Sequence, residues 1–136
     1  MQNTYTYNYY ELAVQKWCGQ DKPYQIHGLW PQITNATYPE FCENIPYNSS
    51  IPPDLVDRMN NDWDNCENET SLWEHEWNKH GTCFAKQTNQ DQMTYFNTAL
   101  NMFDLVKNRT EKCNDKTECI LACFDLDYNK IDCEKN

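Results

Sequence analysis

The sequence lacks a long apolar run and a recognisable leader. No stretch is apolar over the roughly 20 residues that a membrane-spanning helix needs, so we expect no membrane insertion. No signal peptide is visible, and we expect a mature form to which a start Met has been added. The 136 residues contain no repeat and no linker, which predicts one domain over residues 1–136.

Basic residues are scarce. The chain has 11 Lys and Arg against 21 Asp and Glu, and its formal net charge is −10. A protein that coats nucleic acid without specificity needs a basic face, so this composition argues against that class. An enzyme with a small local cationic site is still compatible with it. Near the sequence pI of about 4.6 many carboxylates are protonated, so a working pH of about 5 would remove most of the repulsion toward a polyanion.

Cysteine, in contrast, is abundant. The eight cysteines show no paired C-x-x-C spacing, so a disulfide framework in an oxidising compartment is a better interpretation than a metal site. Four sequons, at Asn35, Asn48, Asn68 and Asn108, agree with a secreted or lumenal glycoprotein. Eight cysteines allow about 105 pairings, and counting alone does not choose among them.

Hydrophobic periodicity predicts a mixture of strands and helices. The first strand shows a phase slip near Tyr10, which indicates a bulge, and Pro31 should end the second. The predicted strands cover residues 5–14, 24–32, 119–124 and 129–133. The predicted helices cover residues 53–63, 72–80 and 91–107. The predicted loops and turns cover residues 33–53, 64–70 and 108–118.

The segment HEWNKHGTC, residues 75–83, contains two of the three histidines of the chain. A capping box at residues 71–74 predicts that a helix begins there, and Gly81 should end it. At about 100° per residue, His75 and Lys79 share one face, and Glu76 and His80 lie beside them. The four polar groups therefore cover an arc of roughly 140°. Trp73 and Trp77 form the other stripe and are most simply core residues.

A zinc-peptidase site would need the spacing HExxH, whereas this helix has HExxxH. His75 and His80 diverge by about 140°, and Lys79 would bring a cation next to the metal. We therefore expect neither a metal nor another cofactor. Acid–base chemistry needs less, because two histidines can share proton transfer while a lysine neutralises a phosphate oxygen. Glu76 could orient His80, or hydrogen-bond the reacting phosphate when protonated.

The third histidine lies in IHGLWPQ, residues 26–32. Gly28 permits close backbone approach, and Trp30 offers a stacking surface. His27 and a histidine of the helix, together with Lys79, form a plausible set for cleaving RNA through its own 2′-hydroxyl. One imidazole would remove the hydroxyl proton and the other would protonate the leaving oxygen. An ordinary solvated helix face is the alternative that the residues leave open.

The segments IHGLWPQ and WEHEWNKHGTC, in this order, resemble the two active-site segments of the ribonuclease T-two family, the acid, transferase-type ribonucleases. Weaker similarity covers YPEFC (38–42), YFNTALNMF (95–103) and the C-terminal CFDLDYNKIDC. The resemblance implies an α+β fold, an antiparallel β-sheet with packed helices that is stapled by disulfides. Typical members carry a longer segment between the helix at 91–107 and the final strands, so we expect a trimmed version of the ribonuclease T-two fold.

The resemblance also implies residue roles. His80 is similar to the general base of the family and His27 to its general acid. Glu76 and Lys79 resemble the pair that activates the phosphate and stabilises the intermediate. His75 resembles the histidine that positions the phosphate.

Four further positions are similar to substrate-binding residues of the family. Trp30 and Tyr38 stand where members stack a base. Gln32 replaces an Asp with which some members read the base, which leaves the base preference open. Trp73 resembles a residue at the phosphate site, with a core role as the equal alternative.

The family implies cleavage of single-stranded RNA through a 2′,3′-cyclic phosphate to 3′-phosphate ends, often fastest at acid pH. DNA should be resistant because it lacks the 2′-hydroxyl. We expect a monomer that is secreted or held in a lysosomal or vacuolar lumen. The alternative function is a secreted, disulfide-rich effector or binding protein whose role does not need catalysis.

The resemblance finally favours particular disulfides. It favours Cys42–Cys83, which would connect the loop after His27 to the end of the histidine helix. It also suggests Cys18–Cys66 and Cys123–Cys133, which leaves Cys113–Cys119. The serious alternative pairs Cys119 with Cys123 and Cys113 with Cys133.

Overall fold

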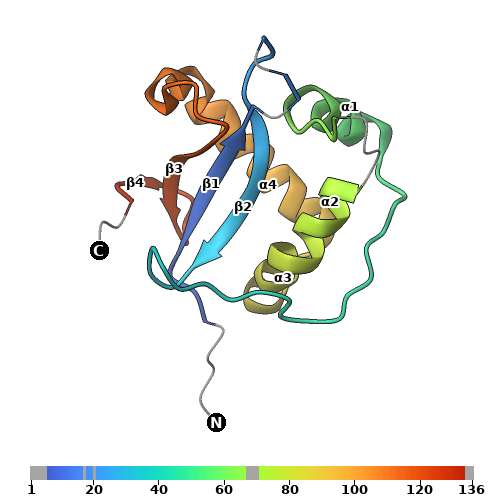
Figure 1. The fold of residues 1–136 in the computed structure, drawn as a ribbon. Coiled ribbons are helices and arrows are strands. Elements are labelled where there is room, and N and C mark those ends of the chain that lie inside the picture. The colour runs from blue at the N-terminus through green and yellow to red at the C-terminus, as the bar shows by residue number, and fades with distance from the viewer. Residues whose placement is uncertain (1–5, 17, 20, 67–70, 134–136) are drawn as a thin grey trace.

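A computed structural model describes residues 6–16, 18–19, 21–66 and 71–133. The strands are β1 (Tyr9–Gln15), β2 (Gln25–Gln32), β3 (Glu118–Asp125) and β4 (Lys130–Ile131). The helices are α1 (Pro53–Asp62), α2 (Ser71–Glu76), α3 (Thr82–Thr88) and α4 (Gln92–Val106). Between them lie a π-helical turn, η1 (Trp77–Gly81), and a 3₁₀ helix, η2 (Lys107–Cys113). The arrangement is shown in Figure 1.

The strands form one antiparallel sheet in the order β2-β1-β3-β4. The predicted bulge exists, although it lies farther along β1, between Leu12 and Val14. Pro31 does not end β2, which continues to Gln32. Because β2 is an edge strand of this sheet, a residue without an N–H is tolerated there.

The first strand is shorter than predicted. Tyr5 lies outside the described residues, and β1 begins only at Tyr9. The backbone of Tyr7 pairs with a side chain instead of a strand: its N–H donates to Gln87 Oε1 at 2.9 Å, and its carbonyl accepts from Gln87 Nε2 at 3.0 Å. The other three predicted strands are confirmed, with β4 reduced to two residues.

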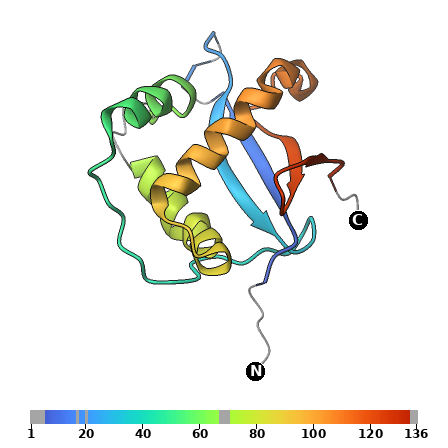
Figure 2. The same cartoon turned by 180° about the vertical axis from the view of Figure 1, so that it is seen from behind.

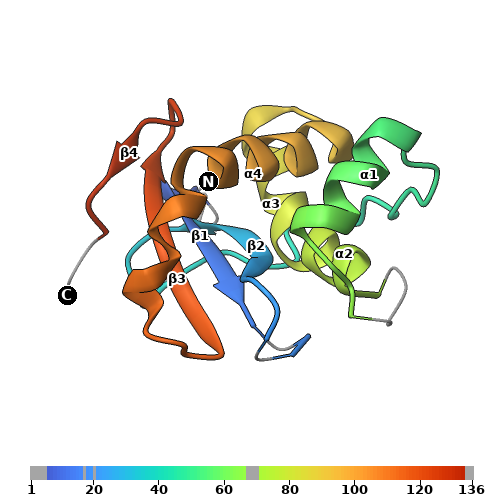
Figure 3. The same ribbon diagram turned by 90° about the horizontal axis from the view of Figure 1, so that it is seen from above.

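The helices pack against the sheet and enclose one apolar core, and α4 runs across the back of β1 and β2 (Figure 2). Viewed from above, the sheet lies on one side and α1, α2 and α3 lie on the other (Figure 3). The predicted helices 53–63 and 91–107 are confirmed by α1 and α4. The largest fully buried side chains include Trp63, Trp77, Tyr7, Tyr10, Tyr95, Phe84, Phe96 and Phe124.

The helix predicted at 72–80 does not stop at Gly81. It begins at Ser71 as expected, passes through η1 and continues as α3 to Thr88. Gly81 has right-handed helical angles, φ −65° and ψ −35°. A Cβ at this position would lie 2.2 Å from Cε3 of Trp77, so Gly81 permits close packing and does not cap the helix. Asn89, with φ 61°, is the left-handed cap instead.

The segment 108–118 was predicted to be a loop, and this was partly wrong. Its first part belongs to η2, and Glu118 begins β3. The segment 33–53 lacks regular structure up to Pro52 and runs around the outside of α3 to α1, as the blue-green trace in Figure 1 shows. No helix in the described part of the chain is long and apolar enough to cross a membrane.

The disulfides are those that the family resemblance favoured. The bonded pairs are Cys18–Cys66, Cys42–Cys83, Cys113–Cys119 and Cys123–Cys133. Cys42–Cys83 joins the loop after β2 to α3. Among the sequons, Asn35, Asn48 and Asn108 are exposed, and Asn68 lies outside the described residues.

Candidate active site

The site lies where β2 meets η1. A π-helical turn bonds from residue i to i+5 and is often found at functional sites. The four polar residues that were predicted to cover one arc of this helix differ in burial. Glu76 and His80 are buried, with 1% and 4% of their surfaces exposed, whereas His75 is exposed. The interpretation of this segment as a solvated face is therefore wrong for Glu76 and His80.

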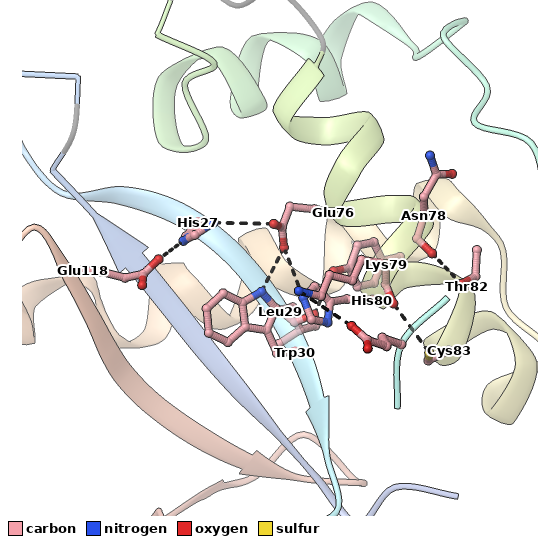
Figure 4. Close-up of polar contacts among 12 residues, drawn as sticks. His27, Leu29, Trp30, Glu76, Asn78, Lys79, His80, Thr82, Cys83 and Glu118 are labelled. Carbon is pink, nitrogen blue, oxygen red and sulfur yellow. Dashed lines mark hydrogen bonds and ion pairs between the residues drawn. The ribbon is translucent and has the colours of Figure 1, made fainter. Parts of the chain in front are cut away.

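Glu76 lies between His27 and His80 (Figure 4). Its Oε1 accepts a hydrogen bond from Trp30 Nε1 at 2.9 Å. His27 Nε2 is 3.5 Å from Oε2, and His80 Nε2 is 4.0 Å from Oε1. A Cβ on Gly28 would lie 2.0 Å from Oε1 and 2.5 Å from Trp30 Nε1, so glycine leaves room for the carboxyl group.

Burial changes the charge that Glu76 carries. Desolvation raises its pKa to about 8, although the hydrogen bond from Trp30 and the nearby Lys79 charge oppose the shift. At neutral and acid pH this carboxyl group is therefore mostly protonated. In that form it can donate a hydrogen bond.

Burial acts on His80 in the opposite direction. Desolvation, aided by the positive charges of Lys79, His75 and His27, lowers its pKa to about 2. The ring stacks on Trp30 with centroids 5.3 Å apart and planes at 28°. Its Nδ1 is buried and has no hydrogen-bond partner among the residues described. His80 is thus held as the neutral imidazole, and the lowered pKa means that it binds a proton weakly.

His27 sits between two carboxyl groups. Its Nδ1 contacts the carboxylate of Glu118 on β3, and its Nε2 faces Glu76. Desolvation lowers the pKa of His27, and the Glu118 charge and hydrogen bond oppose this shift. Trp63 Nε1 donates to the His27 carbonyl at 3.0 Å and fixes the backbone of this residue.

The sequence did not identify Glu118 as a site residue, because it was assigned to a loop. Glu118 pairs with Gln15 of β1, and β1 in turn pairs with β2. Only this register brings Glu118 to His27. The sequence could have placed Glu118 beside His27 only if the pairing of β2, β1 and β3 had been known.

A cavity of about 210 Å³ opens beside His80. It contains three of the four predicted substrate-binding residues. Its lining residues are Glu11, Trp30, Gln32, Asn35, Tyr38, Lys79 and His80. Glu11 and Asn35 were not predicted to line it. Strand alternation could have indicated Glu11, because it lies directly opposite Trp30 in the β1–β2 register.

Lys79 supplies the cation at the mouth of the cavity. Its side chain is 27% exposed, its Nζ is 3.8 Å from Glu40 Oε1, and it lies 5.7 Å from the ring centroid of Tyr38. The carbonyl of Lys79 accepts a hydrogen bond from the Phe41 N–H at 2.8 Å. The loop after β2 is therefore fixed to η1 at the residue that carries the cation.

Four predicted residues lie outside the cavity lining: His27 and Glu76, which are described above, and Trp73 and His75. Trp73 is 4% exposed, and its Nε1 donates to the Trp63 carbonyl at 2.6 Å, which is the environment of a core residue. His75 is exposed, and its charge acts on His27 and His80. Within the described ranges, no three His, Cys, Asp or Glu side chains are grouped so that they could hold a metal ion.

Known proteins resemble this chain in sequence and in fold. The profile of the Ribonuclease T2 family matches residues 2–119. Ribonuclease DdI of Dictyostelium discoideum is 35% identical over 105 residues, which cover 68% of this chain and 47% of that protein. Extracellular ribonuclease LE of Solanum lycopersicum is 40% identical over 82 residues, or 57% of this chain and 35% of that protein.

Among solved structures, a mutant of RNase MC1 in complex with 5′-UMP matches with a TM-score of 0.76 at 22% identity, covering 93% of each chain. RNase MC1 comes from bitter gourd seeds. The aligned regions cover less than half of the two curated relatives. The profile match spans most of this chain, including both histidine-containing segments, and the fold agrees with it. The chain therefore belongs to the Ribonuclease T2 family.

Proposed function

We propose that this protein is an endoribonuclease that cleaves single-stranded RNA by transesterification, without a metal. The products would be a 2′,3′-cyclic phosphate and then a 3′-phosphate end. Family membership supports the reaction class. The observation that carries the proposal is the arrangement of His27 and His80, from different elements, on either side of the buried Glu76.

His80 is proposed as the general base. Burial keeps the His80 imidazole neutral, which leaves a ring nitrogen free to accept the 2′-hydroxyl proton. The lowered pKa makes it a weak base in the free protein, so we propose that the negative charge of the bound phosphate raises this pKa and strengthens the base. The hydroxyl oxygen then attacks the phosphorus. The ring is held against Trp30, which limits its motion.

Glu76 and Lys79 are proposed to stabilise the charged intermediate. The protonated Glu76 can donate a hydrogen bond to a phosphate oxygen, and the Lys79 ammonium can neutralise the developing charge. Both groups are adjacent to His80. A protonated carboxyl group avoids the repulsion that a carboxylate would exert on the phosphate.

His27 is proposed as the general acid. In its protonated form it would donate a proton from Nε2 to the 5′-oxygen as this oxygen leaves. Glu118, in contact with Nδ1, favours the protonated imidazole. In the second step the roles would reverse: His27 would activate water and His80 would protonate the 2′-oxygen.

An acid optimum follows from these pKa shifts. His27 is active when protonated, and burial lowers its pKa, so the rate should fall as the pH rises through this lowered pKa. The neutral form of His80 is present throughout this range. The net charge of −10 acts in the same direction, because acid pH reduces repulsion of the RNA.

The cavity beside His80 is the proposed base site. Since His80 would take the 2′-hydroxyl proton, the base in the cavity belongs to the nucleotide that supplies this hydroxyl. Trp30 and Tyr38 offer aromatic surfaces for it, and stacking contributes about 1–3 kcal/mol per base. His75 is proposed to attract the phosphate by its exposed charge.

The remaining proposals concern setting and assembly. The four disulfides, and a relative named as extracellular, support a secreted or lumenal protein that carries glycans at exposed sequons. We propose that residues 1–136 act as one domain and as a monomer. DNA, which lacks the 2′-hydroxyl, would not be cleaved.

The test is incubation with a short single-stranded RNA in EDTA at about pH 5, near the range where an imidazole titrates. Mass spectrometry of the fragments should find 2′,3′-cyclic phosphate ends, and a DNA of the same sequence should stay intact. Intact RNA after incubation with fully oxidised protein would contradict the proposal. In that case a binding or effector role would be preferred.

A further inference from the structure

One buried carboxyl group in the cavity takes no part in the proposed chemistry. Glu11 lies in the middle of β1 and is 9% exposed, and it lines the cavity together with Trp30 and Gln32. In the sheet register it lies opposite Trp30 on one side and Cys123 on the other. Its position is therefore fixed by two neighbouring strands.

The carboxyl group of Glu11 makes no hydrogen bond or ion pair with any residue that the structure describes. A buried polar group without a partner destabilises the fold, and such groups are uncommon. Burial raises the pKa of Glu11, which reflects the same desolvation. Glu11 lowers the stability of the fold and lines a cavity, so its carboxyl group is a candidate for contact with a ligand.

The cavity has two chemically different sides. The η1 segment contributes Lys79 and His80, which suit a phosphate and a ribose hydroxyl. The sheet contributes Glu11 and Gln32, which suit the polar edge of a base. A carboxylate next to a phosphate would repel it, so Glu11 fits the base side. The Gln32 amide is held in place because its Nε2 donates to the Thr34 carbonyl at 2.8 Å.

We propose that Glu11 selects the base in this cavity, accepting two hydrogen bonds from guanine; this inference rests on the proposed function. Guanine presents two adjacent donors, N1–H and N2–H, which match the two oxygens of a carboxylate. Adenine and cytosine present one amino group beside an acceptor nitrogen. Uracil presents one N–H between two carbonyl oxygens, and a carboxylate repels these two oxygens.

The test compares four dinucleoside phosphates, GpC, ApC, CpC and UpC, at neutral pH, which favours the ionised form of Glu11 more than acid pH does. The wild-type protein should show a kcat/KM for GpC that is higher than for the others by roughly tenfold or more, the size of a good bidentate contact. In Glu11→Gln this ratio should fall to near one. The matched control is Glu111→Gln, which removes the same charge from an exposed residue of η2 and should retain the ratio.

The variant should fold, because it loses a buried charge without losing a hydrogen bond. Its thermal midpoint should not be lower than that of the wild type, and Glu11→Leu provides a second variant with an apolar side chain. Equal rates on GpC and ApC in the wild type would overturn the proposal. A guanine preference that persists in both Glu11 variants would overturn it as well.

Measurements of nucleotide binding distinguish the proposed role of Glu11 from the proposed ribonuclease activity. Calorimetry with 2′-GMP and 2′-AMP needs no turnover. If the protein cleaves no RNA but binds 2′-GMP more tightly, and Glu11→Gln loses that difference, then the proposed function fails and the role of Glu11 is supported. If RNA is cleaved and the two nucleotides bind equally, the role of Glu11 fails alone.

Discussion

The surroundings of His27 and of His80 differ although the two side chains are the same. His27 lies on an edge strand, is partly open to solvent and has a carboxylate at Nδ1. His80 lies on a π-helical turn, is buried against Trp30 and has positive neighbours. A carboxylate favours imidazolium, whereas burial among cations disfavours it. The comparison teaches that the neighbours decide which imidazole can act as an acid and which as a base.

The largest effect should come from removing either imidazole. His27→Ala and His80→Ala should each reduce kcat/KM on RNA by roughly 100-fold or more, the usual contribution of a general acid or base. A substrate with an activated leaving group separates the two roles, because a nitrophenolate ion leaves without a proton. On a nucleoside 3′-(4-nitrophenyl phosphate), His27→Ala should regain most of its activity and His80→Ala should not. Rescue of His80→Ala instead would reverse the assignment.

The next largest effects should come from substituting the two glycines that follow His27 and His80. In Gly81→Ala, a Cβ would lie 2.2 Å from a ring carbon of the buried Trp77, so we expect a loss of about 1–3 kcal/mol in the free energy of unfolding. In Gly28→Ala, the clash is with the Glu76 carboxyl group and the Trp30 indole. A displaced reactive group can reduce the rate by about 100-fold, so here the loss should be mainly in activity.

Urea unfolding and kcat/KM, measured on both glycine variants, test this contrast. The expected pattern is a stability loss for Gly81→Ala and an activity loss with a smaller change in stability for Gly28→Ala. If Gly28→Ala kept full activity, the position assigned to Glu76 between the histidines would be in error.

The smallest effect should come from Glu118→Gln. Glu118 and Glu76 face His27, and Lys79 and His75 act on it through their charges. Loss of the Glu118 charge removes a group that favours imidazolium, so the pKa of His27 should fall and the basic limb of the kcat/KM profile should move to lower pH. Because Glu118 is half exposed, we expect a shift of less than about one pH unit.

The pH profile of Glu118→Gln should be compared with that of Glu111→Gln, whose profile should match the wild type. A shift of the basic limb to higher pH would contradict the proposed contact. A lower kcat with an unchanged profile would indicate that Glu118 only orients the ring.

Much of the fold could be predicted because it follows local periodicity. Leu55, Met59 and Trp63 share the buried face of α1 as their spacing indicated, and α4 begins at its Asp91 cap. The π-helical turn could not be predicted, since helical spacing rules assume a regular α-helix. The role of Gly81 depends on Trp77 packing against it, which only the folded chain reveals.

The prediction of the site shows the same contrast between local sequence features and features that depend on the folded chain. The family resemblance identified His27, Glu76 and His80, and the structure brings all three together. Glu11 was missed because its neighbours depend on the register of β1, and Glu118 was missed because it was assigned to a loop. Acidic residues on a strand carry no motif. Long-range strand pairing places Glu118 beside His27 and Glu11 opposite Trp30.

The attachment of the loop after β2 to the helical segment has a mechanical consequence. This loop carries Tyr38, and it is joined to η1 and α3 by the Cys42–Cys83 bond, by Phe41 N–H on the Lys79 carbonyl and by Trp77 Nε1 on the Ile45 carbonyl. The cavity wall that carries Tyr38 and the turn that carries His80 are therefore tied together. If the proposed base site is correct, a nucleotide would bind between walls whose spacing is already set by these three links.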